Sequence, residues 1–238
     1  MNAQLPSGRQ LPLRAASTAV LVKGVAVTVL ALALAAFGIS GTQKSIAAPR
    51  DGHRVSAQEF HDQMRKLWED HITWTRLTIV SFAADLPDLE PTLERLLRNQ
   101  DDIGDAFRPY YGDAAADRLT ALLREHINGA VDLLVAARSG DPEQLEAAKR
   151  AWYANGNEIA DFLSALNPKN WPREEMRSMF REHLDLTLKE ATDRLQGNFA
   201  ADIADYDVVH SQALEMADML SDGIIAQFPH RFHQKAGK

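Results

Sequence analysis

An internal repeat constrains the fold of this chain more than any single motif does. The segments LLREH (122–126) and MFREH (179–183) lie 57 residues apart, and each ends in a histidine within an apolar helical pattern. A weaker copy, EDH, occupies residues 69–71. Self-similarity at a fixed period of this length is typical of a supersecondary unit repeated along the chain.

The same 57-residue shift aligns features beyond the histidines. It places Gly140 on Gly197 and EIADFLS (158–164) on EMADMLS (215–221), while DIGDAF (102–107) belongs to the weaker first copy. A glycine that follows a helical pattern is a common C-cap. The repeat therefore predicts an αα-hairpin of about 56 residues, present three times.

Helical periodicity continues from residue 56 to residue 226. The segment SAQE (56–59) has the pattern of a capping box, with Ser56 as N-cap and Glu59 at the third helical position. Apolar residues then recur at 3–4 spacing, and no convincing period-2 alternation indicates strands. The expected fold is all-α, an up-down six-helix bundle of three αα-hairpins, preceded by an N-terminal signal or anchor helix. The expected helices run from the cap at 56 to a break at 85–91, and then over about 92–107, 114–138, 143–166, 173–196 and 200–226.

Six polar residues recur every 27–29 positions, one in each expected helix. In an up-down bundle, two residues at equal distances from a turn lie at the same height. Helical periodicity also places these positions within apolar stripes, so we expect them to face inward. They form one candidate polar layer, which consists of His71, Asn99, His126, Asn155, His183 and Gln212.

Two interpretations of this polar layer stay open. Because a buried polar group without a partner costs about 1–3 kcal/mol, the six side chains should satisfy one another or a ligand. In the first interpretation, a histidine–amide hydrogen bond in each hairpin fixes the helix register. In the second, the layer holds a small polar ligand or a divalent transition metal, for which imidazole and carboxylate are suitable ligands. The candidate metal ligands are His71, His126, His183, Asp102, Glu158 and Glu215.

Familiar catalytic and metal-binding motifs are missing from the sequence. It contains no E-x-x-H, no H-E-x-x-H and no cysteine. These absences argue against a ferritin-like di-iron site, a zincin site and any thiolate chemistry. The pair His230 and His233 has i,i+3 spacing, but its surroundings, FPHRFHQKAGK, are typical of a solvated tail.

Residues 1–47 have the pattern of an export signal or a membrane anchor. Three basic residues precede an uncharged run, GVAVTVLALALAAFGIS (24–40), and small residues follow at Ser45, Ala47 and Ala48. A basic region, an apolar region and a small-residue site describe a cleaved signal. A retained run of this length is marginal for a bilayer core of about 30 Å. Both alternatives place the rest of the chain in the periplasm or extracellular space, or at the outer face of the cytoplasmic membrane.

The charge of the chain bears on its partners. Residues 1–47 carry four basic and no acidic side chains, so the net charge of −7 becomes −11 for residues 48–238. A strongly acidic domain binds neither nucleic acid nor anionic lipid readily. A membrane is expected as a partner only through an uncleaved N-terminal segment, and no feature indicates a protein partner.

Four segments of the chain resemble a known family. NQDDIGDAF (99–107), PYYGD (109–113), FLSALNPKNW (162–171) and QFPHRF (227–232) are similar to segments of an uncharacterised family of exported or anchored bacterial all-helical proteins. The resemblance covers nearly the whole region after the N-terminal segment. It implies a helical fold and an exported location. That family has no established activity, so no site residue carries over.

These observations define one expected organisation and three ranked functions. Residues 1–47 are a signal or anchor, 48–55 a linker, 56–228 a helical-repeat bundle and 229–238 a tail. The leading expectation is a non-enzymatic exported bundle whose polar layer binds a metal ion or a small polar ligand. The alternative is a structural or partner-binding envelope protein in which the layer only fixes helix register. A metal-dependent enzyme ranks third.

Overall fold

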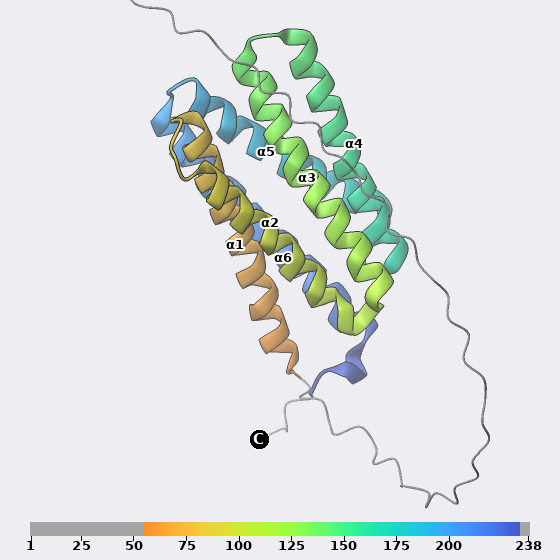
Figure 1. Cartoon of the computed structure of the whole chain (residues 1–238). Helices are drawn as coiled ribbons and strands as arrows, with labels where there is room; N and C mark the ends of the chain where they lie inside the picture. Colours follow the sequence, from red (N-terminus) through yellow and green to blue (C-terminus); the bar gives the residue numbers. More distant parts are fainter. Residues whose placement is uncertain (1–54, 234–238) are drawn as a thin grey trace, which may run out of the picture. The chain divides into compact units, whose positions relative to one another are not determined.

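Six α-helices follow one another in the computed structural model, which describes residues 55–233. Consecutive helices pack against each other and α6 packs against α1, so the helices close into a ring (Figure 1). The all-α fold and the up-down order of six helices are therefore confirmed. The expected signal or anchor at 1–47 lies outside the described residues. The helices are α1 (Ala57–Ala83), α2 (Leu89–Tyr111), α3 (Asp113–Ser139), α4 (Pro142–Leu166), α5 (Arg173–Leu195) and α6 (Phe199–Gln227), followed by the 3-10 helix η1 (Pro229–Arg231).

Local signals fix several helix ends as expected. Ser56 Oγ accepts a hydrogen bond from the Glu59 backbone N–H at 3.1 Å, and Glu59 accepts one from the Ser56 N–H at 2.7 Å. This reciprocal pair confirms the capping box at the start of α1. Gly140 ends α3 with a left-handed φ of 74°, and the Asp141 side chain caps the first turn of α4. None of the helices in residues 55–233 is long and apolar enough to cross a membrane.

Helix α2 extends beyond both ends of the helix expected at about 92–107, because it includes a proline near each end. It begins at Leu89, so Pro91 occupies the first turn, where a missing N–H breaks no intrahelical bond. It ends at Tyr111 and carries Pro109 in its last turn. Gly112, with a φ of 81°, then reverses the chain into α3. The expected stop at the RPYYGD segment is therefore about four residues too early.

The segment after residue 228, expected as a tail, packs onto the bundle through Phe232. Phe232 is buried and its ring lies against Tyr110 and Phe60, with centroids 5.4 Å from each. The His233 backbone N–H also donates to the carbonyl oxygen of Val55 at 3.1 Å. Aromatic packing therefore joins the two ends of the described chain. His230 and His233 themselves are exposed.

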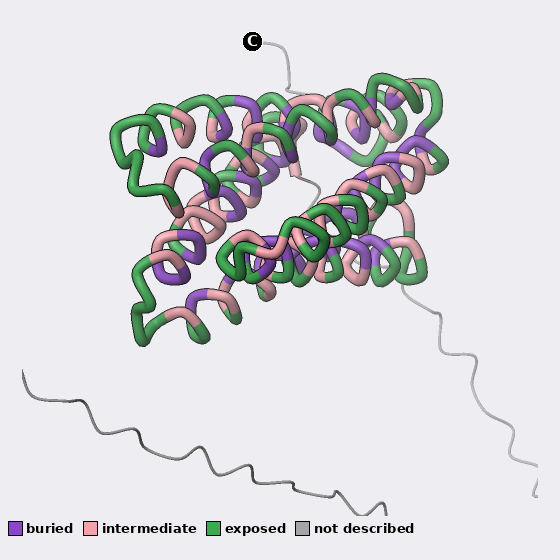
Figure 2. The backbone as a smooth tube through the Cα atoms, turned by 90° about the horizontal axis from the view of Figure 1, so that it is seen from above, coloured by how far each residue is buried: buried purple, intermediate pink, exposed green. Residues whose placement is uncertain are grey.

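The core of the described unit is formed by residues of all six helices. Buried positions recur along each helix on the sides that face neighbouring helices, and exposed positions lie outside and at the turns (Figure 2). The largest buried cluster runs from Phe60 in α1 to Ile224 in α6 and also includes Trp171 between α4 and α5. The described residues 55–233 all belong to one compact unit, and its buried cluster lies within residues 60–232. We therefore expect it to fold by itself.

Candidate functional site

The second hairpin shows how the polar layer is built. His126 in α3 is buried, and its Nδ1 lies 2.9 Å from Oδ1 of Asn155 in α4. Because an amide oxygen only accepts, the ring N–H donates, and neutral His126 carries its proton on Nδ1. The Asn155 amide nitrogen donates in turn to the carbonyl oxygen of Leu122 at 3.2 Å. One amide therefore links the ring to the main chain one turn before it.

The third hairpin repeats this arrangement in the same order. The Nδ1 of His183 in α5 donates to Oε1 of Gln212 in α6 at 3.0 Å. The Gln212 nitrogen donates to the carbonyl oxygen of Met179 at 3.3 Å. In both hairpins the amide follows the histidine by 29 residues, and the carbonyl precedes the histidine by four. The sequence pairs His126–Asn155 and His183–Gln212 are confirmed.

The first hairpin divides the same contacts between two residues. Nδ1 of His71 lies 3.3 Å from the amide nitrogen of Gln100, which is the residue 29 positions later. Asn99 instead donates to the carbonyl oxygen of Leu67 at 3.0 Å. The expected His71–Asn99 pair is therefore wrong for the ring, because successive residues of a helix point about 100° apart. Asn99 therefore makes the main-chain hydrogen bond, and Gln100 makes the contact with the histidine ring.

Burial controls the protonation of the three histidines. Loss of hydration, followed by the nearby His183, lowers the pKa of His126 to about 4, although the Asn155 hydrogen bond acts in the opposite direction. The pKa of His71 is also lowered, first by burial and then by the charges of His183 and His126. Burial lowers the pKa of His183 as well. All three rings are therefore neutral at pH 7.

The structure brings the histidines together but leaves the proposed carboxylate ligands outside. The rings of His71 and His183 have centroids 5.9 Å apart. Asp102, Glu158 and Glu215 are exposed on the even-numbered helices. Within residues 55–233, no group of three or more histidine or carboxylate side chains is arranged to hold a metal ion. The six-residue metal set predicted from the sequence is not assembled.

One cluster of buried charges escaped the sequence prediction. Arg76 in α1 bonds Oε1 of Glu190 at 2.9 Å and Oδ2 of Asp202 at 2.8 Å, and Arg194 lies 3.4 Å from Asp202. Glu190 and Asp202 are fully buried, and Oε2 of Glu190 has no hydrogen-bond partner in the described chain. Burial raises the pKa of Glu190 to about 7, although Arg76 opposes this effect. Glu190 follows His183 by seven residues, a spacing that places both on one helix face. That spacing is the signal that could have located it.

The fold and the layer together define a class of all-α, up-down bundles with three histidine–amide pairs in the interior. Comparison of the chain with protein-family models, curated proteins and solved structures finds no match. The resemblance to the bacterial helical family stays a prediction from four segments of the sequence.

Proposed function

We propose that this chain is a non-enzymatic bundle of three repeated αα-hairpins in which the polar layer fixes the register of each hairpin. The observation that supports this is the shared hydrogen-bond chain in the second and third hairpins, from imidazole to amide to main-chain carbonyl. A slip of one residue moves a helix by about 1.5 Å and 100°, which separates both pairs of atoms. In both hairpins the imidazole Nδ1 and the amide group therefore have their partners within the chain.

The sequence of residues 1–47 supports an exported location for this bundle. A cleaved signal would release it, and a retained segment would hold it at the outer face of the cytoplasmic membrane. In that setting the bundle is a structural or partner-binding envelope protein. Proteolytic mapping of the N-terminus of the protein recovered from membrane and soluble fractions distinguishes the two forms.

A double-mutant cycle on His126 and Asn155 tests the structural role. Each alanine substitution leaves the other side chain, the buried His126 or the half-buried Asn155, without its partner, so we expect each to lower the unfolding free energy by about 1–3 kcal/mol. The double variant should be more stable than the sum of the single losses predicts. Urea unfolding measures all four proteins, and Glu125→Ala on the exposed side of the same turn is the control. Additive effects, or no loss of stability, would refute a direct pair.

A metal-binding layer is the second candidate, and one observation favours it. In metal sites, a histidine commonly donates one ring N–H to an oxygen and ligates through the other nitrogen. The Nδ1 bonds of His126 and His183 leave Nε2 as the lone-pair nitrogen. Gln100 approaches His71 with its amide nitrogen at 3.3 Å, however, so His71 lacks the Nδ1–H···O bond that orients the other two rings.

Elemental analysis separates the two candidates. Residues 49–238, refolded with excess Zn²⁺ and then desalted, should retain less than one tenth of an equivalent of metal. One equivalent in the wild type, lost in both His126→Ala and His183→Ala, would favour the metal site over the structural layer.

A further inference from the structure

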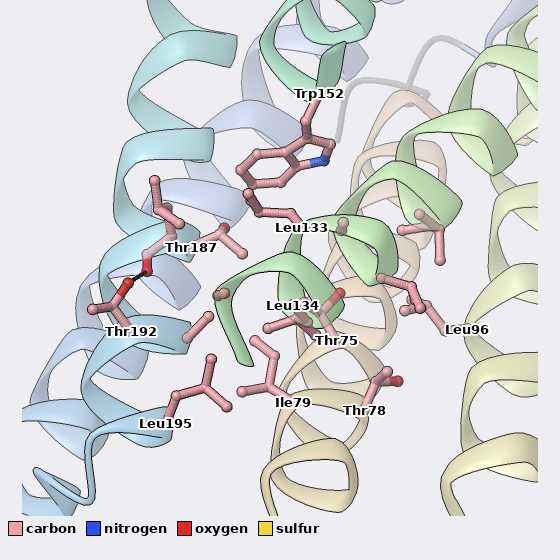
Figure 3. A pocket seen from close by; sticks show the side chains of 16 residues that line it. Thr75, Thr78, Ile79, Leu96, Leu133, Leu134, Trp152, Thr187, Thr192 and Leu195 are labelled. Atoms are coloured by element: carbon pink, nitrogen blue, oxygen red, sulfur yellow. Dashed lines mark hydrogen bonds between the residues drawn. The ribbon is translucent and has the colours of Figure 1, made fainter. Parts of the chain in front are cut away.

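An apolar cavity lies between α1, α3 and α5, one helical turn beyond the polar layer (Figure 3). Its wall includes Thr75, Ala130 and Thr187, which each follow a layer histidine by four residues. Trp152 borders one end and Leu195 the opposite end (Figure 3). The empty space is about 550 Å³, including the part open to solvent.

The cavity offers mainly hydrocarbon surface, and the hydrogen-bond donors in its wall are already engaged. Its threonine hydroxyls donate to carbonyl oxygens of their own helices at 2.7–2.8 Å: Thr75 to His71, Thr78 to Trp74, Thr187 to His183 and Thr192 to Leu188. The Trp152 N–H donates to the carbonyl oxygen of His126 at 3.2 Å. Water needs two to four polar partners to occupy a cavity stably. An alkyl chain needs none.

The cavity continues into a wider cleft at the end of the bundle. Ala137, Leu188, Thr192 and Leu195 line both spaces. At this end the α3–α4 turn stands away from the α1–α2 and α5–α6 turns (Figure 1). The space wide enough for the centre of a water molecule is about 50 Å³ in the cavity and about 560 Å³ in the cleft. A ligand can therefore enter from this end.

The rim of the cleft carries charges of both signs. Arg138 is engaged, because its guanidinium lies over the Phe82 ring and bonds Asp85 at 2.7 Å. Lys149 and Glu146 lie one turn apart on α4, and neither forms an ion pair within residues 55–233. They present a cation and an anion beside the entrance to an apolar space. This pairing matches a headgroup that itself carries both charges.

We propose that the cavity and cleft bind a single-chain amphiphile, with its alkyl chain inside the ring and a zwitterionic headgroup at Lys149 and Glu146. The wall from Leu195 to Thr187 spans eight residues of α5, or about 12 Å. Affinity should rise about fourfold for each added methylene, until the chain exceeds this depth. Beyond that length the gain per methylene should fall.

Calorimetric titration of residues 49–238 with alkylphosphocholines of eight, ten and twelve carbons tests the proposal. Each is used below its critical micelle concentration. We expect saturable one-to-one binding with a negative heat-capacity change, accompanied by a change in Trp152 fluorescence that Trp152→Phe removes. Decanoate and decyltrimethylammonium have the same chain as decylphosphocholine, and we expect each to bind at least threefold more weakly.

Two alanine-to-leucine variants locate the binding site. Ala191 lines the cavity, so Ala191→Leu should weaken binding at least tenfold. Ala147 is exposed on α4 and lines neither space, so Ala147→Leu should bind as the wild type does. Circular dichroism checks that both are folded. If Ala191→Leu does not fold, Ala130→Leu fills the same cavity from α3. Absence of saturable binding, or wild-type affinity in a folded cavity variant, would overturn the site. Equal affinity for the three headgroups would overturn the role of the rim.

Discussion

The environment of His126 is set by one neutral oxygen. Asn155 accepts the Nδ1–H without adding charge, while burial lowers the pKa of the ring to about 4. A carboxylate at the same position would stabilise the imidazolium. Asn155→Asp should therefore raise the pKa of His126 by about 1–3 pH units. NMR titration of the ring protons measures this change. Asn128→Asp, an exposed position two residues after His126, is the matched control. A His126 pKa still near 4 in Asn155→Asp would contradict the pairing.

The histidine–amide pairs were predictable because a turn at the centre of a hairpin fixes which residues face each other. This reasoning located Asn155 and Gln212 correctly, and it missed Gln100 by one residue. Distance from a turn places a residue along the helix axis, whereas its direction depends on where the helix begins. Glu158, one of the candidate metal ligands, is exposed and paired with Arg118. Burial of an ionised carboxylate costs much of its hydration free energy, and so the predicted carboxylate ligands lie outside the layer.

Helix α6 accommodates a bulky side chain from the α4–α5 connection. Trp171 is fully buried, and its indole N–H donates to the carbonyl oxygen of Met219 at 3.2 Å. Asn167 donates to the carbonyl oxygen of Gly223 at 2.9 Å. A Cβ atom at Gly223 would overlap the Trp171 ring. A small residue at this position therefore lets the connection approach the helix backbone.

Gly223→Ala should consequently destabilise the bundle by about 1–3 kcal/mol, the usual cost of overpacking. Gly129→Ala is the matched control, because its new Cβ would meet one side-chain atom, Trp152 Cδ1, at 3.3 Å, a close contact that a small shift of the ring relieves. In an α-helix that change adds helix propensity of up to about 1 kcal/mol. Urea unfolding followed by circular dichroism compares the two. Equal stability of the two variants would mean that the connection moves away from α6 at little cost.

Helix order was predictable because the apolar period and the caps are local properties of the sequence. Helix ends depended on more distant contacts. Phe232 lies beyond the last strong apolar repeat, but Tyr110 and Phe60 give it a buried position. The same limit applies to the cavity between α1, α3 and α5. Its wall residues are of the types found in any hydrophobic core. Only the separation of the helices in the structure shows that no neighbouring side chain fills the space between them.

Closure of the ring depends on contacts between the first and last helices. Arg65 in α1 bonds both oxygens of Asp218 in α6 at 2.6–2.7 Å near the surface. One end of the bundle adds the buried cluster of Arg76, Glu190 and Asp202, which joins α1, α5 and α6. Removing one partner of a buried charge pair costs about 3–5 kcal/mol, because the other charge stays buried. Arg76→Met should therefore lower the unfolding free energy more than Arg65→Met. Denaturant unfolding of the two variants at pH 7 measures the difference, and equal losses would contradict the importance of burial.

Glu190 gives the stability of the bundle a pH dependence opposite in sign to that of the histidines. Its pKa is raised to about 7, so between pH 4.5 and 7 the folded chain holds a proton that the unfolded chain has released, and stability falls as the pH rises. The lowered pKa values of the histidines act in reverse, because the unfolded chain gains protons first as the pH falls below 6.5. Glutamine resembles the protonated carboxyl, so Glu190→Gln should match the wild type near pH 5 and exceed its unfolding free energy by about 1–3 kcal/mol at pH 8. Urea unfolding at the two pH values measures this, and Glu182→Gln, exposed eight residues earlier on α5, is the control. An equal difference at both pH values would show that the substitution acts through packing and that Glu190 does not titrate in this range.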